Sequence, residues 1–102
     1  MIARRWTGRV PAERSDEYLA YLNATGLKDY AATPGHLGTT VLRRTVDGIT
    51  EFELTTFWES TDAIRAFAGD DISIARYYPE DEEFLLELNE HVEHWEVVAS
   101  PA

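Results

Sequence analysis

Hydrophobic and polar residues alternate at the start of the chain. Ile2, Trp6 and Val10 fall on one face of an extended segment, whereas Arg5 falls on the other. A period of two residues is typical of a strand that is buried on one face. The pattern therefore predicts a first strand over residues 2–10.

A different period follows, with hydrophobic residues three or four positions apart. They are Tyr18, Leu19, Tyr21, Leu22, Leu27 and Tyr30. This spacing predicts one long helix whose broad hydrophobic face lies on a sheet. Pro11 suits its first position, because proline has no N–H group to leave unpaired there. The helix should not pass Thr33, since the residue before Pro34 is restricted to extended geometry.

Residues 36–46 and 49–58 return to a strand-like composition, rich in threonine and in large hydrophobic residues. They flank Asp47-Gly48, a dipeptide typical of the tight turns that join antiparallel strands. We predict a hairpin with Trp58 at the end of its second strand.

The remaining residues predict two helical segments and a closing strand. Ser60 is a suitable N-cap for a short helix that ends near Gly69. Pro79, which four acidic residues follow, is typical of the start of another helix, here one with hydrophobic residues as far as Leu88. Residues 90–99 are expected to form the last strand.

These elements give the order β-α-β-β-α-(α)-β, which is that of the ferredoxin-like, or split β-α-β, arrangement. We expect a single α+β domain over residues 1–102, with helices on one face of a four-stranded antiparallel sheet. The other face must meet water or a second copy of the chain. Two-fold pairing would bury Phe57, Trp95 or Val97 if they lie on that face, and we therefore expect a homodimer.

Charge and composition narrow the range of partners. Nine Lys and Arg residues against nineteen Asp and Glu residues give a net charge of −10, which repels phosphate backbones and anionic lipids. Neither nucleic acid nor a membrane is expected as a partner. No segment approaches the roughly 20 apolar residues of a membrane span, and residues 1–10 lack the apolar centre of a signal peptide. A cytoplasmic location is the expectation.

The sequence gives little support for a metal site or for a cysteine nucleophile. The absence of cysteine excludes disulfides and thiolate sites. His91, Glu93 and His94 are metal-ligand types, but on a strand His94 points away from the other two, so no metal site is expected. Arg4-Arg5 likewise places one guanidinium on each sheet face. Only one of the two could reach a buried anion, and ion pairs with carboxylates are the alternative.

The junction between the predicted hairpin and the following helix resembles the antibiotic biosynthesis monooxygenase superfamily. The residues that carry the resemblance are Phe57-Trp58-Glu59-Ser60, Ala63, Ile64, Phe67 and, before the hairpin, Pro34-Gly35. The resemblance implies a dimeric α+β barrel. It also implies one of several functions, among them cofactor-independent oxygenation of phenols and quinols and degradation of haem.

The haem-degrading branch of this superfamily uses an Asn on the first strand, the Trp of the junction and a His after the second helix. Trp58 matches the Trp. In place of the other two the chain has Arg5-Trp6 and Arg76-Tyr77-Tyr78. Haem degradation is therefore disfavoured, and no cofactor is expected.

The aromatic residues near this junction are the candidate site. Trp6, Trp58, Phe67, Tyr77 and Tyr78 are predicted to line a substrate pocket between sheet and helices, and the candidate catalytic residues are Trp58, His36 and Tyr77. Alternatives remain open for each. The tryptophans can be core residues, the tyrosines a packed turn, and the histidine a solvent-facing side chain.

Two functions are compatible with these residues. The first is a cofactor-independent monooxygenase that acts on an electron-rich aromatic small molecule. The second is a dimeric module that binds such a molecule, or serves as an accessory protein, without catalysis. No convincing base is recognisable in the sequence, which keeps the second open.

Overall fold

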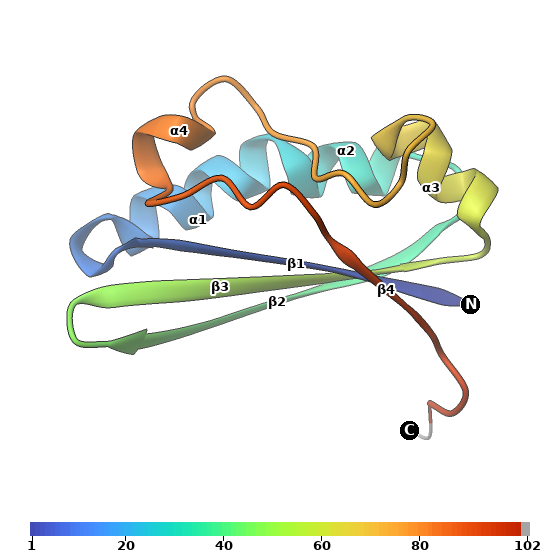
Figure 1. The fold of residues 1–102 in the computed structure, drawn as a ribbon, viewed down its shortest axis with the longest axis horizontal. Helices are drawn as coiled ribbons and strands as arrows, with labels where there is room; N and C mark the ends of the chain where they lie inside the picture. Colours follow the sequence, from blue (N-terminus) through green and yellow to red (C-terminus); the bar gives the residue numbers. More distant parts are fainter. Residues whose placement is uncertain (101–102) are drawn as a thin grey trace.

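The computed structural model describes residues 1–100. It has a four-stranded antiparallel sheet of order β2-β3-β1-β4, with helices on one face (Figure 1). The elements are β1 (Ile2–Pro11), a 3-10 helix η1 (Ala12–Arg14), α1 (Ser15–Ala24), α2 (Gly26–Ala32), β2 (His36–Val46), β3 (Ile49–Trp58), α3 (Thr61–Ala68), α4 (Asp81–Phe84) and β4 (Glu93–Glu96). The predicted α+β, ferredoxin-like fold is confirmed.

The predicted hairpin forms β2 and β3. Asp47 and Gly48 both have positive φ, 51° and 78°, as a two-residue turn between strands requires. Every second residue of β3 is buried, from Thr50 to Trp58. This alternation places one face of the strand under the helices and the other on the open side of the sheet.

The helix after the hairpin begins and ends as predicted. The Ser60 hydroxyl accepts a hydrogen bond from the backbone N–H of Ala63, at 3.2 Å, and so caps α3. Gly69 ends the helix with a φ of 93°, in the region that favours glycine.

The single long helix predicted from Pro11 to Thr33 is wrong. Pro11 remains in β1, opposite Ile49, and the next backbone N–H, that of Ala12, donates to the carbonyl of Gly48. Proline suits the end of a strand as well as the start of a helix, and here pairing with the hairpin prevails. The helix is also interrupted at Thr25, whose φ and ψ are −120° and −94°.

The third helix and the last strand are both shorter than predicted. α4 ends at Phe84, because Leu85 is extended and the N–H of Leu86 donates to the carbonyl of Arg9 on β1, at 2.9 Å. Asn89 donates its side-chain N–H to Thr7 of the same strand, at 2.8 Å. Hydrogen bonds to β1 thus hold this segment extended, and β4 pairs with β1 only through Glu93–Glu96.

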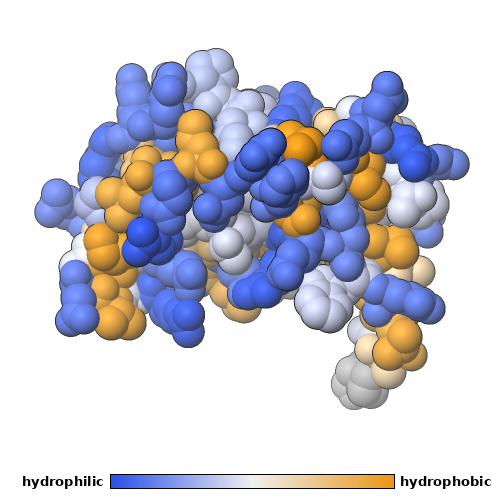
Figure 2. All heavy atoms as spheres, in the orientation of Figure 1, coloured by the Kyte–Doolittle hydropathy of each residue, from blue (hydrophilic) through white to orange (hydrophobic). Residues whose placement is uncertain are grey.

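The core lies between the helices and the sheet. Val10, Tyr18, Phe52, Trp58 and Ile64 are essentially inaccessible to solvent there. Figure 2 shows mainly hydrophilic side chains on the face in view, with a group of hydrophobic ones on the left, near α4 and the end of the β2–β3 hairpin, and others in the upper centre and on the right. No helix within residues 1–100 is long and apolar enough to cross a membrane.

Candidate functional site

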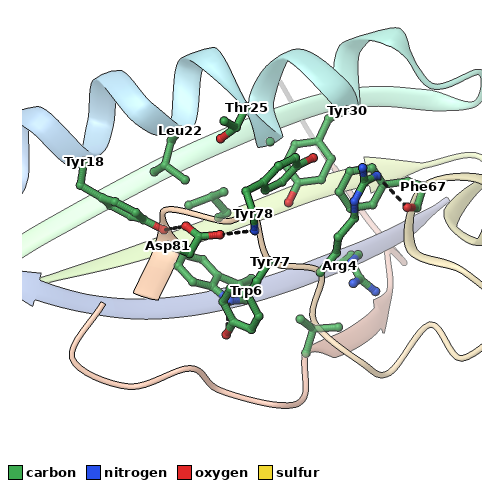
Figure 3. Close-up of a pocket in the computed structure, with 14 residues that line it drawn as sticks. Arg4, Trp6, Tyr18, Leu22, Thr25, Tyr30, Phe67, Tyr77, Tyr78 and Asp81 are labelled. Carbon is green, nitrogen blue, oxygen red and sulfur yellow. Dashed lines mark hydrogen bonds between the residues drawn. The ribbon is translucent and has the colours of Figure 1, made fainter. Parts of the chain in front are cut away.

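A small cavity lies between the sheet, α1, α2 and the segment of residues 69–80 that joins α3 to α4 (Figure 3). Six of its fourteen lining residues are aromatic. Its lining residues are Arg4, Trp6, Tyr18, Leu22, Thr25, Gly26, Tyr30, Leu54, Phe67, Arg76, Tyr77, Tyr78, Asp81 and Val92. Larger hollows lie on the surface and have more exposed linings. One of them is lined by the ion pairs that Arg5 and Arg44 form with Glu53 and Glu51. The buried aromatic cavity is therefore the candidate site.

Trp6 forms the floor of the cavity on β1. Its indole N–H donates to the hydroxyl of Tyr77 at 3.1 Å, and the two rings meet edge to face, with their centres 6.2 Å apart. Gly8 makes room for this indole, since a Cβ atom there would lie 2.3 Å from the ring. The strand thus needs glycine at Gly8 because the Trp6 side chain lies across it.

Two tyrosines of the 69–80 segment form the opposite wall. The Tyr77 hydroxyl, which accepts from Trp6, donates to the carbonyl of Asn89, at 2.5 Å. The Tyr78 hydroxyl donates to the carboxylate of Asp29 on α2, also at 2.5 Å. Burial, and then the hydrogen bond to Asp29, raises the pKa of Tyr78, so it stays a neutral donor. The segment is therefore tied both to the helices and to the chain before β4.

Arg4 is the buried cation of the site. Its side chain, only 4% exposed, donates to the carbonyls of Ile72 and Ile74 in the 69–80 segment. The same guanidinium lies 3.1 Å from the Nε2 atom of His94 on β4. Burial lowers the pKa of Arg4, and burial followed by the charge of Arg4 lowers that of His94. His94 is therefore neutral, and Arg4 carries the local positive charge.

Arg76 places a second guanidinium at the cavity. It lies over the rings of Phe67 and Tyr78, 4.7 and 5.1 Å from their centres, and donates to the Phe67 carbonyl. Its contact with the carboxylate of Asp29 is longer, 3.6 Å. Both guanidinium groups thus adjoin aromatic walls, an arrangement that attracts electron-rich or anionic molecules.

Asp81 is the single carboxylate among the described residues of the cavity lining. It is 4% exposed and accepts hydrogen bonds from the Tyr18 hydroxyl, at 3.2 Å, and from the backbone N–H of Tyr78, at 2.6 Å. Burial raises the pKa of Asp81 despite these two hydrogen bonds. A buried carboxylate with a raised pKa is a candidate proton acceptor.

The raised pKa of Asp81 predicts how stability depends on pH. The folded protein keeps the Asp81 proton to higher pH than the unfolded chain, where the pKa is near 3.8. The stability that this proton contributes is present below that value and is lost as the pH rises through the raised pKa. Asp81→Asn, which has no such proton to lose, should therefore gain stability relative to the wild type between about pH 4 and about pH 7. Urea unfolding at the two pH values measures the free energy of unfolding of the wild type and of the variant. A difference between the two proteins that is the same at both pH values would contradict the prediction.

The structure brings together four of the predicted binding residues, namely Trp6, Phe67, Tyr77 and Tyr78. Trp58 lies behind Phe67 and Tyr30, is wholly buried, and is absent from the cavity lining. Its indole N–H donates to the hydroxyl of Thr56, at 2.7 Å.

His36 also lies outside the cavity lining. Its ring stacks on Tyr30 and meets Trp58 edge to face, and its Nε2 atom is 2.7 Å from the hydroxyl of Thr39. Of the three candidate catalytic residues, only Tyr77 touches the cavity. Their catalytic roles stay predictions.

Several lining residues were not singled out from the sequence as site residues. Tyr18 and Tyr30 belong to the helical stripe and were assigned to packing. Asp81 belongs to the acidic run after Pro79, a pattern that predicts a helix start and no buried carboxylate, yet it is only 4% exposed. One signal for Arg4 was available, because alternation along β1 puts it on the same face as Trp6.

The cavity is nearly filled by its own walls. Its volume of about 30 Å³ is far below the roughly 300–1,000 Å³ of a typical small-molecule site. An aromatic ligand therefore requires the walls to move apart. Residues 69–80 form the wall with the least regular structure, since a bridge between Ile74 and His91 is their one strand-like pairing among the described residues.

Metal-binding geometry is absent from the described part of the chain. Within residues 1–100 no group of three or more His, Asp or Glu side chains is placed to hold an ion. His94 faces Arg4, whereas His91 and Glu93 are exposed.

Comparison with known proteins shows the fold at full length. No family model and no curated protein matches the chain. Among solved structures, a proposed antibiotic biosynthesis monooxygenase from Bacillus cereus is 19% identical, with a TM-score of 0.65 over 99% of this chain and 95% of its own.

The haem degrader MhuD from Mycobacterium tuberculosis, with two haems in its active site, is 23% identical, with a TM-score of 0.63 over the full length of both chains. A mutant of MhuD with two manganese protoporphyrin IX molecules per active site is 24% identical, with a TM-score of 0.65 over 100% of this chain and 99% of its own. At these identities the likeness shows the fold. It confirms the ferredoxin-like arrangement that the order of the elements predicts.

Proposed function

We propose that the protein is a cofactor-independent monooxygenase whose substrate is an electron-rich aromatic molecule, of the quinol or anthrone type. The observation that supports this is the cavity between sheet and helices, with aromatic walls, two guanidinium groups and one buried carboxylate. The full-length likeness to a proposed antibiotic biosynthesis monooxygenase agrees with it. Fold alone does not define an activity, so the chemistry of the cavity carries the proposal.

The reaction asks little of the protein beyond binding and proton removal. An ionised substrate supplies electrons to dioxygen itself. For an anthrone, the CH₂ carbon receives one oxygen atom as a carbonyl, and the second oxygen atom leaves with the two hydrogens as water. The protein must hold the ring, exclude water and accept the first proton.

Side chains in the cavity can perform each of these tasks. Trp6 and Tyr77 meet edge to face, so a flat ring can pack against either of them once the walls separate. Arg4 supplies positive charge for the oxygen that becomes anionic. Asp81 accepts the proton, and because burial raises its pKa it is a stronger base than an exposed carboxylate.

Oxygen uptake tests the proposal. Wild-type protein should consume dioxygen when given a panel of reduced anthrones and quinols, and no consumption across a diverse panel would refute it. Asp81→Asn should lower the rate by about 100-fold or more, since it removes the proton acceptor. Asp62→Asn, at an exposed carboxylate on α3, is the matched control and should leave the rate unchanged.

A second copy of the chain is part of the proposal. Helices cover one face of the sheet, and no helix covers the other (Figure 1). On that face Ala3 lies between Phe57 and Trp95, and Trp95 is 58% exposed. A homodimer would cover this hydrophobic row.

The alternative function is binding without catalysis. The observation that favours it is the narrow cavity, whose wall is held by hydrogen bonds from Arg4, Tyr77 and Tyr78. Such a site suits a protein that retains a hydrophobic molecule. Thermal stabilisation by aromatic ligands without any oxygen uptake would identify this function, and turnover would exclude it.

A further inference from the structure

We propose that the cavity is specific for aromatic molecules that carry an anionic oxygen, a carboxylate or an ionised phenol, and that the Arg4 guanidinium binds this oxygen. The inference refines the proposed function by naming the substrate class of the same site. It depends on the partners of Arg4 and on where they lie.

Arg4 lacks the partner that its burial leads one to expect. The chain has nineteen Asp and Glu residues, yet the hydrogen bonds and ion pairs of Arg4 within residues 1–100 include no carboxylate. Arg5, the next residue, is 3.0 Å from a carboxylate oxygen of Glu53 and 3.1 Å from one of Glu93. A buried charge without a counter-charge is costly, so a site that keeps one is suited to receive an anion.

In the structure, neutral hydrogen-bond acceptors occupy the position beside Arg4 where an anion would bind. The guanidinium donates to the carbonyls of Ile72 and Ile74, and neighbours the neutral ring of His94. The carbonyls are neutral, so an anionic oxygen in their place would add a charge–charge attraction to the guanidinium, and this attraction is strong in a site shielded from water. An anionic ligand can therefore displace the two carbonyls.

The neighbouring groups favour an aromatic ligand over a free inorganic anion. Trp6 and Tyr30 line the cavity with Arg4, and Arg76 lies over the ring of Phe67 on the same cavity. These side chains present ring faces and edges against which a flat molecule can stack. The charge of Arg76 is partly balanced by the carboxylate of Asp29, 3.6 Å away, so Arg4 is the main attraction for an anion.

Opening of the cavity is coupled to this exchange. Both carbonyls that Arg4 holds belong to the 69–80 segment, which also carries the wall residues Tyr77 and Tyr78. A ligand oxygen that takes their place on Arg4 removes two hydrogen bonds that hold the segment against β1. The anion thus binds to Arg4 and at the same time loosens the wall. The loosened wall provides space for the ligand that the present cavity, of about 30 Å³, lacks.

Matched probes test the inference without any turnover. Anthraquinone-2-carboxylate and anthraquinone-2-carboxamide have nearly the same shape, and neither is a reduced substrate. Calorimetry on the wild type should show the carboxylate binding about tenfold more tightly or better. For an ionised phenol, 2-hydroxyanthraquinone should bind more tightly as the pH rises through the pKa of its hydroxyl group. Equal affinity for carboxylate and carboxamide, or binding of neither, would overturn the inference.

Variants assign the preference to Arg4. Arg4→Gln should abolish the difference between carboxylate and carboxamide, and Arg4→Lys should retain part of it. Arg65→Gln removes the same charge from an exposed ion pair on α3 and should change nothing. If Arg4→Gln does not fold, the affinities of the wild type and of Arg4→Lys for carboxylate and carboxamide still test the inference. A folded Arg4→Gln that keeps the preference would refute the role of Arg4.

The outcomes separate this inference from the proposed oxygenase activity. A carboxylate preference that depends on Arg4, without oxygen uptake from any anthrone or quinol, would support the anion site and refute the oxygenase. Oxygen uptake without any preference for anionic probes would do the reverse.

Discussion

Replacing Trp58 with alanine is expected to lower the free energy of unfolding by about 3–5 kcal/mol. Trp58 is wholly buried and packs against Tyr30, His36 and Phe67, with ring centres 5.2 to 6.2 Å apart. The variant would leave a large void and remove the hydrogen bond that the Thr56 hydroxyl accepts from the indole N–H. Since domains of this size are stable by only about 5–15 kcal/mol, this loss is a large fraction of the total stability. Urea unfolding, followed by circular dichroism, measures the loss.

Trp58→Phe separates packing from a direct role in the site. Phenylalanine keeps most of the buried surface and loses the hydrogen bond to Thr56, so we expect a loss of only about 1–2 kcal/mol. Because Trp58 is absent from the cavity lining, this variant should also keep the affinity for aromatic ligands. A stable Trp58→Phe protein that no longer binds them would show that Trp58 takes part in the site after all.

Replacing Trp95 with glutamate is expected to convert a dimer into a monomer. Trp95 is 58% exposed in the single chain, so the change should cost that chain little stability. In a dimer that covers the open face, the same change would bury an unpaired carboxylate against Phe57 and Ala3. Light scattering should report twice the chain mass of 11.6 kDa for the wild type and 11.6 kDa for the variant.

A control on the other side of the molecule completes this experiment. Leu88 is 46% exposed and lies beside α4, next to Tyr77 and Pro79. Leu88→Glu adds the same charge there and should leave the dimer intact. A wild-type protein that is monomeric at high concentration would refute the homodimer.

Elements specified by local chemistry were predictable from the sequence. The turn at Asp47-Gly48 and the cap at Ser60 depend on residues within a few positions of each other. Hydrophobic period alone then distinguishes strand from helix. The hairpin and α3 followed from such signals.

Elements that depend on contacts with distant strands were not predictable in detail. Pro11 stays extended because it pairs with Ile49, and α4 stops at Phe84 because Leu86 bonds to Arg9. Neither partner is evident from local composition. Where local preference is weak, the hydrogen bonds offered by a neighbouring strand decide the conformation.

For the site, the amino-acid pattern alone specified which residues could share a face, including Arg4 with Trp6 and apart from Arg5. It also indicated the aromatic character of the pocket. Which groups meet there was a property of the folded chain. Arg4 reaches carbonyls 68 and 70 positions away, and Tyr18 reaches Asp81 63 positions away. Burial of these side chains, and the pKa shifts that burial causes, require segments that are far apart in the sequence to pack together and exclude water. A local sequence pattern contains no information on which distant segments will meet.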